Sequence, residues 1–154
     1  MEDIKYPGVG LGVVIVNEDG NILVGKRKGS HAALKYSIPG GKLGLGETFE
    51  AGVVREIKEE TNLDIFDPKV IAVSNNLETF KEEKKHYVSV ILLVKKFSGE
   101  LKLMEPAKCE EWIWVDPKEL PQQPVMSVLN SLRSIHVLEH LSCRQSFSME
   151  LPGV

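Results

Sequence analysis

Residues 41–63 read GKLGLGETFEAGVVREIKEETNL, and this stretch decides the fold and the chemistry that the sequence predicts. Its first part is rich in glycine, which favours a loop. Phe49, Val53 and Ile57 then recur at every fourth position, the spacing of one apolar face of an α-helix. Asn62 stands where a helix ends in a left-handed residue, a place that Asn tolerates. We therefore predict a helix over residues 47–61 that follows a glycine-rich loop.

Carboxylates gather on one face of this predicted helix. Successive residues turn by about 100°, so Glu56, Glu59 and Glu60 fall within an arc of roughly 100°. Stacked like charges cost a helix a few tenths of a kcal/mol, and Arg55 is the cation placed to reach Glu59. Such a face suits Mg²⁺ or Mn²⁺, because hard cations prefer oxygen ligands. A solvated acidic face is the alternative that the helix by itself leaves open.

The spacing of the whole stretch resembles the Nudix box, G-x5-E-x7-R-E-U-x-E-E-x-G-U, in which U is a bulky aliphatic residue. The chain matches this pattern from Gly41 to Leu63 with one departure, Asn62 in place of the last glycine. Segments 25–28, 39–42, 86–88 and 105–112 are similar to stretches of the MutT-like, type 15 nucleotide triphosphate diphosphatases of the Nudix hydrolase family. The resemblance implies an α/β Nudix fold, with a mixed β-sheet sandwiched between α-helices.

The resemblance also implies roles for the charged residues of the box. Glu56 and Glu60 match the principal metal ligands, and Glu59 matches a further ligand or the general base. Glu47 matches a supporting carboxylate. Arg55 matches the arginine that orients the catalytic carboxylates through charge-assisted hydrogen bonds. Glu56, Glu59 and Arg55 are therefore the expected catalytic residues.

Further site residues are implied outside the helix. Arg27 matches a phosphate-contacting arginine, although the solvated end of an edge strand is an equally good interpretation of it. Gly40, Gly41 and Lys42 open the box and are expected to contact substrate. Glu105 lies near the position of a metal-binding glutamate in a loop of MutT-like proteins.

The rest of the chain predicts strands around the helix. Residues 9–16 and 22–26 flank an Asp-Gly turn and predict a β-hairpin. Further strands are expected at 70–74, 87–97 and 111–115, and loops at 29–36 and 78–85. An apolar stripe predicts a second amphipathic helix from Pro124. We expect one domain over residues 1–154, with a core at about 8–141 and a sheet covered on both faces.

Two other patterns are assigned to packing. Gly8, Gly10 and Gly12 lack the spacing of a dinucleotide-binding loop and predict close backbone packing in a sheet. Trp112 and Trp114 alternate along a predicted strand and are expected to pack against the core.

Composition limits the partners. The 154 residues are 42% hydrophobic and 27% charged, which is typical of a globular domain. A net charge of −3 argues against nucleic acid or an anionic membrane as the main partner. Cys109 and Cys143 form no zinc or disulfide pattern, which favours a reducing compartment. The acidic start is not that of a signal peptide, and we expect a cytoplasmic protein.

These observations predict a Mg²⁺-dependent (or Mn²⁺-dependent) pyrophosphohydrolase. Its expected substrates are nucleoside triphosphates, oxidised or modified purine nucleotides among them, and its products a monophosphate and pyrophosphate. The resembling proteins also suggest a homodimer.

Two alternatives stay open. One is hydrolysis of another diphosphate-containing small molecule, such as a nucleoside diphosphate, nucleotide sugar or prenyl diphosphate. Residues 128–133 favour it, because they lack the aromatic side chains that the resembling proteins carry there. The other is a non-catalytic Nudix-fold binding module, against which the intact glutamates argue.

Overall fold

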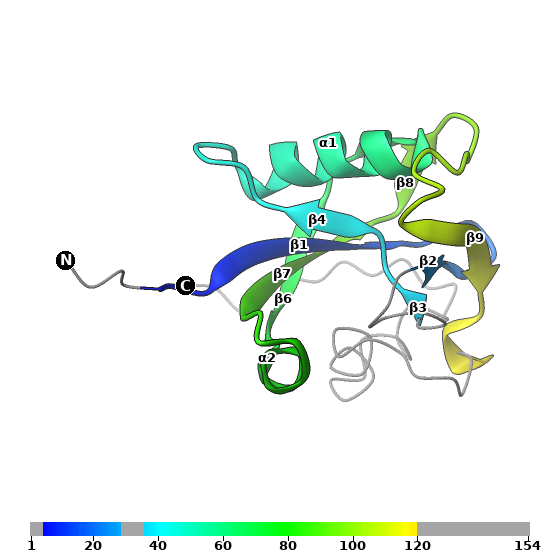
Figure 1. The fold of residues 1–154 in the computed structure, drawn as a ribbon. Helices are drawn as coiled ribbons and strands as arrows, with labels where there is room; N and C mark the ends of the chain where they lie inside the picture. Colours follow the sequence, from blue (N-terminus) through cyan, green and yellow to red (C-terminus); the bar gives the residue numbers. More distant parts are fainter. Residues whose placement is uncertain (1–4, 29–35, 120–154) are drawn as a thin grey trace.

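The computed structural model describes residues 5–28 and 36–119 (Figure 1). Its helices are α1 (Phe49–Thr61), α2 (Leu77–Glu83) and the 3₁₀ helix η1 (Pro117–Glu119). Its strands are β1 (Gly8–Ile15), β2 (Ile22–Arg27), β3 (Tyr36–Ser37), β4 (Gly40–Lys42), β5 (Asp64–Phe66), β6 (Lys69–Asn75), β7 (Tyr87–Val94), β8 (Lys96–Ser98) and β9 (Cys109–Val115).

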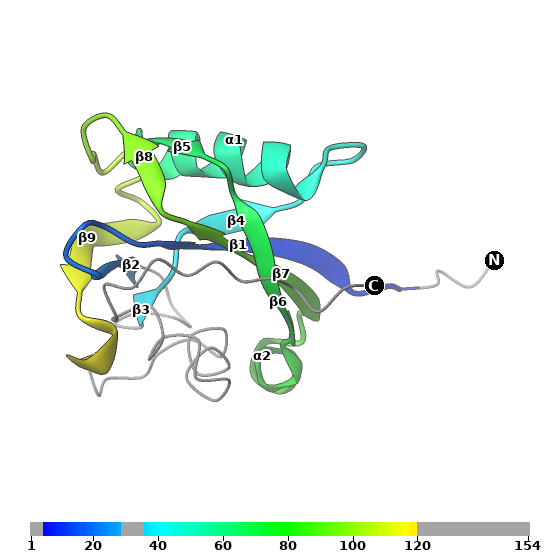
Figure 2. The same cartoon turned by 180° about the vertical axis from the view of Figure 1, so that it is seen from behind.

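The strands form a mixed sheet system. The main sheet has the order β4-β1-β7-β6, in which β1 and β7 are parallel and the other neighbours are antiparallel. A second sheet has the order β3-β2-β9, and β5 pairs with β8. In Figures 1 and 2, α1 lies along one side of the main sheet and α2 lies on the other side, below the ends of β6 and β7. The expected α/β class with a mixed sheet is confirmed within the described residues.

Two apolar layers hold these elements together. Alternating side chains of β1 and β7 point to opposite faces, so each strand contributes to both layers. The layer beneath α1 consists of Leu11, Val13, Ile15, Leu23, Val53, Ile57, Leu63, Ile65, Val90, Leu92 and Val94. Trp112 and Trp114 pack against it, as expected. Each fully buried aliphatic side chain contributes about 1.5–3 kcal/mol, so this layer fixes α1 on the sheet.

Helix α1 begins and ends through local capping. Thr48 Oγ1 accepts a hydrogen bond from the Ala51 N–H at 3.1 Å, so the helix starts at Phe49, two residues after the predicted start. Asn62 ends it with a left-handed φ of 65°, as expected. Val53 and Ile57 are fully buried, whereas Phe49 remains 37% exposed at the edge of the apolar stripe.

The hairpin predicted from residues 9–16 and 22–26 is wrong except for the residue pair next to its turn. Val16 and Ile22 form an antiparallel bridge, but β1 and β2 then diverge into different sheets. A strand has only two hydrogen-bonding edges, and β4 and β7 already occupy those of β1.

Other boundaries also differ from expectation. The predicted loop at 78–85 is wrong, because residues 77–83 form α2, which ends at Lys84 with a φ of 58°. Its Glu and Lys residues are good helix formers as well as charged ones. The single strand expected at 87–97 is divided into β7 and β8. Most of the loop expected at 29–36 and the helix expected from Pro124 lie outside the described residues.

Glycines allow β1 and β4 to approach each other. A β-carbon on Gly40 would overlap the Leu11 carbonyl oxygen, and one on Gly12 would lie 2.9 Å from the side chains of Ile38 and Ile91. The expected close backbone packing around Gly12 is therefore confirmed. A β-carbon on Gly10 would meet only the Ser89 hydroxyl, at 3.3 Å, as a close contact.

Gly40→Ala is expected to destabilise the protein by about 1–3 kcal/mol or more, because β4 must move away from β1. Gly10→Ala, on the facing strand, is the matched control and should cost much less. Urea denaturation of both variants measures the difference. Equal stabilities would show that the contact between Gly40 and Leu11 is not tight.

Candidate active site

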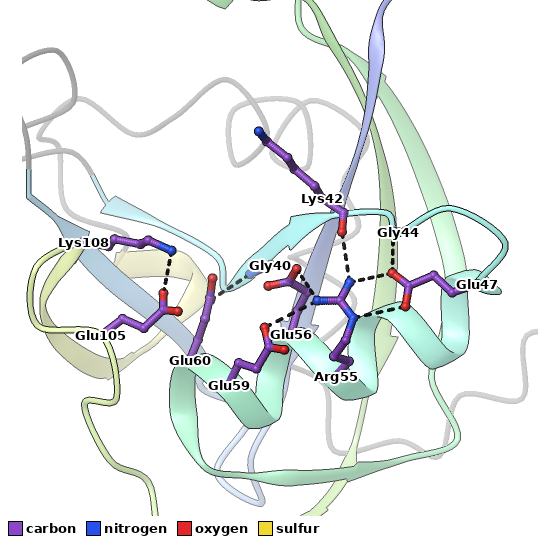
Figure 3. A network of polar contacts seen from close by, with 10 residues as sticks. All are labelled: Gly40, Lys42, Gly44, Glu47, Arg55, Glu56, Glu59, Glu60, Glu105 and Lys108. Carbon is purple, nitrogen blue, oxygen red and sulfur yellow. Dashed lines mark hydrogen bonds and ion pairs between the residues drawn. The ribbon is translucent and has the colours of Figure 1, made fainter.

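Strand β4 brings its backbone against the carboxylates of α1. The Gly40 N–H donates to Glu60 Oε2 at 3.2 Å. The Glu56 carboxylate lies where a β-carbon of residue 41 would be, so only glycine leaves room for it. Figure 3 shows both carboxylates directed toward β4 from the same side of the helix. The two glycines thus position the acidic face of α1 at the edge of the sheet.

Arg55 is the centre of a polar network on one side of Glu60 (Figure 3). Its Nε and Nη2 donate to the two carboxylate oxygens of Glu47, at 3.1 and 2.5 Å. Its Nη1 donates to Glu56 Oε1 at 2.8 Å and, more weakly, to Glu59 Oε2 at 3.4 Å. Nη2 also donates to the Lys42 carbonyl at 3.1 Å. A planar guanidinium can hold this many partners in fixed directions, so it orients the carboxylates around it.

Glu47 links this network to the glycine-rich loop. Its Oε1 accepts the Gly44 N–H as well as Arg55. The hydrogen bond from Arg55 is the main cause that holds the pKa of Glu47 below its usual range, and the Gly44 N–H adds to it. Glu47 therefore stays ionised and keeps the loop fixed to the helix.

Glu60 lies between the Arg55 network and a second ion pair. Burial raises the pKa of Glu60 to about 7, and the charges of Glu56 and Glu105 add to the rise. The Gly40 N–H and the charge of Lys108 oppose it. Glu105 lies on the loop before β9, where its Oε2 is 3.2 Å from Lys108 Nζ. The acids from α1 and from this loop are therefore close enough to affect one another electrostatically.

A cavity of about 490 Å³ adjoins these acids. Its wall includes Glu60 and Glu105, and it contains every substrate contact that the sequence predicts: Arg27, Gly40, Gly41 and Lys42. Other wall residues, to which the sequence assigned no role, include the basic Lys28, Lys85 and Lys108 and the aromatic Tyr87. They come from separate loops and strand ends, and no spacing in the sequence connects them.

The structure does not bring all predicted site residues to one point. Glu59 is exposed and faces Arg55, and it is not part of the cavity wall. In the ranges 5–28 and 36–119, no three acidic, histidine or cysteine side chains converge closely enough to hold an ion as they stand. A cation bound by Glu56, Glu60 and Glu105 would therefore require side-chain rotations.

Residues 5–28 and 36–119 contain no helix that is long and apolar enough to cross a membrane.

A family model described as "NUDIX domain" matches residues 6–133. The chain belongs to the Nudix hydrolase family. This confirms the resemblance of the sequence to that family and identifies the protein as a hydrolase of phosphoric anhydride bonds.

Known Nudix proteins resemble the chain in sequence and in structure. An ADP-ribose pyrophosphatase of Methanocaldococcus jannaschii is 34% identical over 108 residues, which cover 70% of this chain and 62% of that one. An 8-oxo-dGTP diphosphatase of Escherichia coli is 30% identical over 124 residues, 77% of this chain and 93% of that one. The crystal structure of a MutT NUDIX hydrolase from Burkholderia pseudomallei superposes with a TM-score of 0.76 at 32% identity, covering 88% and 98% of the two chains.

Glu47→Gln is expected to lower the melting temperature at pH 7, because Arg55 and the Gly44 N–H lose an ionised acceptor. The folded-state pKa of Glu47 lies below the ordinary pKa of a glutamate, so its stabilisation is fully present above that ordinary pKa and is lost as the pH falls through the folded-state pKa. The difference from the unmodified protein should therefore shrink in acid. Glu100→Gln, at an exposed ion pair with Lys102, is the control. A Glu47→Gln deficit that is constant with pH would contradict the assigned role.

Proposed function

We propose that this Nudix hydrolase is a divalent-cation-dependent pyrophosphohydrolase that converts nucleoside triphosphates to monophosphate and pyrophosphate. The observation that carries the proposal is the position of Glu60. This half-buried carboxylate lies near two other acids, at the wall of a cavity that also presents Arg27 and Lys42. Acids that bind a cation and bases that bind an anion thus share one site, as hydrolysis of a metal-complexed polyphosphate requires.

The residues fit Mg²⁺ or Mn²⁺. The donor set of Glu56, Glu60 and Glu105 is made only of carboxylate oxygens, which hard divalent cations prefer. Gly41 leaves a space that any larger residue would take from Glu56. These three residues would hold the cation, and Glu59 would be either a further ligand or the general base. When bound, such a cation polarises phosphoryl oxygens and lowers the pKa of a coordinated water.

The remaining steps belong to the residues of the chain. Glu59 is 52% exposed and can accept a proton from the attacking water at its carboxylate. Arg55 holds Glu56 and Glu59 in place. Arg27 and Lys42 neutralise negative charge on the phosphates, and the backbone at Gly40 and Gly41 permits their close approach.

The side of the cavity near α2 supports a substrate that forms hydrogen bonds. Asn76 and Ser89 are buried there, and Asn76 Nδ2 donates to Ser89 Oγ at 2.8 Å. Tyr87 adds an aromatic ring, with Lys42 Nζ 5.9 Å from its centroid. Buried polar groups disfavour an apolar prenyl chain and favour a base or sugar. The relatives named for ADP-ribose and 8-oxo-dGTP also act on nucleotides.

A second candidate substrate is a nucleotide sugar such as ADP-ribose. The 34% identity to the archaeal ADP-ribose pyrophosphatase favours it. The same residues would serve either substrate, because both contain a phosphoric anhydride.

From the resemblance and the composition we also propose a cytoplasmic homodimer that binds neither nucleic acid nor membranes. Gel filtration tests the dimer.

A panel of nucleoside triphosphates, 8-oxo-dGTP, ADP-ribose and geranyl diphosphate tests the substrate. With Mg²⁺, the triphosphates are expected to give the highest kcat/KM and to release pyrophosphate, measured as phosphate with and without added pyrophosphatase. Phosphate release that needs no pyrophosphatase, or a preference for geranyl diphosphate, would contradict the proposal. Turnover of ADP-ribose above all triphosphates would support the second candidate.

Glu56→Gln and Glu60→Gln are each expected to lower kcat by roughly 10³-fold or more, since losing one cation ligand costs several kcal/mol of barrier. Circular dichroism should show that both variants remain folded. Glu50→Gln, an exposed change in the first turn of the same helix, should keep full activity. Near-normal turnover by either of the first two variants would show that the ligand assignment is wrong.

A further inference from the structure

The loop before β9 is fixed against the end of α1. The Met104 N–H and the Trp112 Nε1–H both donate to the Glu60 carbonyl oxygen, each at 3.3 Å. Within the loop, the Lys108 N–H donates to the Glu105 carbonyl at 3.0 Å. The backbone therefore places the Glu105 and Lys108 side chains beside Glu60, as Figure 3 shows.

A second set of contacts fixes residues 105–108, which form a turn within this loop, to the end of β2. The Lys28 N–H donates to the Lys108 carbonyl at 3.0 Å, and Lys28 Nζ donates to the Pro106 carbonyl at 3.2 Å. The ammonium of Lys28 thus holds the turn. The ammonium of Lys108 instead points toward the acids.

The two partners of the Lys108–Glu105 ion pair differ in their exposure to solvent. The Lys108 side chain is 76% exposed and that of Glu105 is 32% exposed. The hydrogen bond to Glu105 is the main cause that raises the pKa of Lys108, and the charges of Glu60 and Glu56 add to it. Exposed pairs of this kind contribute little to stability, so the ammonium can leave Glu105 at little cost. Lys108 also lines the cavity, where a phosphate would lie.

We propose that Lys108 changes partners during substrate binding: it neutralises Glu105 until a divalent cation takes that carboxylate, and its ammonium then binds the diphosphate of the substrate. This inference rests on the proposed function of the site. It follows from geometry, because one flexible side chain is paired with Glu105 and lines the same cavity as Glu105 and Glu60. Lysine suits the exchange, since its compact charge lies at the end of a flexible stem.

The exchange predicts effects of opposite sign. Removing the charge of Lys108 removes a cation that competes for Glu105, so a divalent cation alone should bind more tightly. The same change removes a ligand of the substrate, so a diphosphate should bind more weakly. A residue that only supports the fold would not strengthen one affinity while weakening the other.

The test compares Lys108→Met with the unmodified protein in two binding measurements. Mn²⁺ alone is titrated and free Mn²⁺ is followed by electron paramagnetic resonance, where we expect the dissociation constant to fall by on the order of tenfold. Imidodiphosphate, a non-hydrolysable diphosphate, is then titrated calorimetrically at saturating Mn²⁺, where we expect the dissociation constant to rise by on the order of tenfold.

Two variants serve as controls. Lys108→Arg keeps the charge and should retain the unmodified Mn²⁺ affinity. Lys102→Met removes an exposed lysine from a comparable pair with Glu100 and should change neither affinity.

Unchanged or weaker Mn²⁺ binding by Lys108→Met would overturn the inference, and so would unchanged imidodiphosphate binding. The proposed function fails separately, if the unmodified protein hydrolyses no member of the substrate panel. The Mn²⁺ comparison involves no substrate and still decides whether Lys108 competes for the carboxylate.

Discussion

The contact between β4 and α1 is the constraint on which the site depends. Gly40 and Gly41 have no side chains, so the strand backbone reaches the helix and the Glu56 carboxylate fits beside it. The Gly40 N–H also gives Glu60 a hydrogen bond where water is partly excluded. A β-carbon on Gly41 would displace the Glu56 carboxylate, and one on Gly40 would overlap the Leu11 carbonyl oxygen and force β4 away from β1. A structural requirement of the sheet and a chemical requirement of the site therefore coincide at the same two residues.

Crowded carboxylates have to be balanced by cations, and the molecule uses two kinds. Arg55 is fixed through hydrogen bonds to Glu47, Glu56 and the Lys42 carbonyl, which makes it a permanent part of the framework. Lys108 forms one exposed pair with a flexible stem. A planar guanidinium suits the first task because it holds several partners at once, whereas a single ammonium suits a contact that has to be exchanged.

Predictions that rest on the spacing of residues within one segment succeeded, whereas a prediction that depends on which distant strands pair with each other failed. The helix, its left-handed end at Asn62 and the buried positions Val53 and Ile57 follow from spacing along one segment. The hairpin prediction failed because the partners of β1 are set by strands distant in sequence. The loop prediction at 78–85 failed because a charged segment can be either a loop or an exposed helix, and composition does not distinguish them.

The sequence by itself determined the acidic face of α1, the arginine beside it and the family to which the chain belongs. Those features depend on the helical repeat, which is the same in any surroundings. Only the tertiary structure decided that the loop with Glu105 and Lys108 lies beside Glu60, and that Asn76 and Ser89 line the same cavity. These contacts join segments that are far apart in the chain, and their distances depend on how whole strands and loops pack.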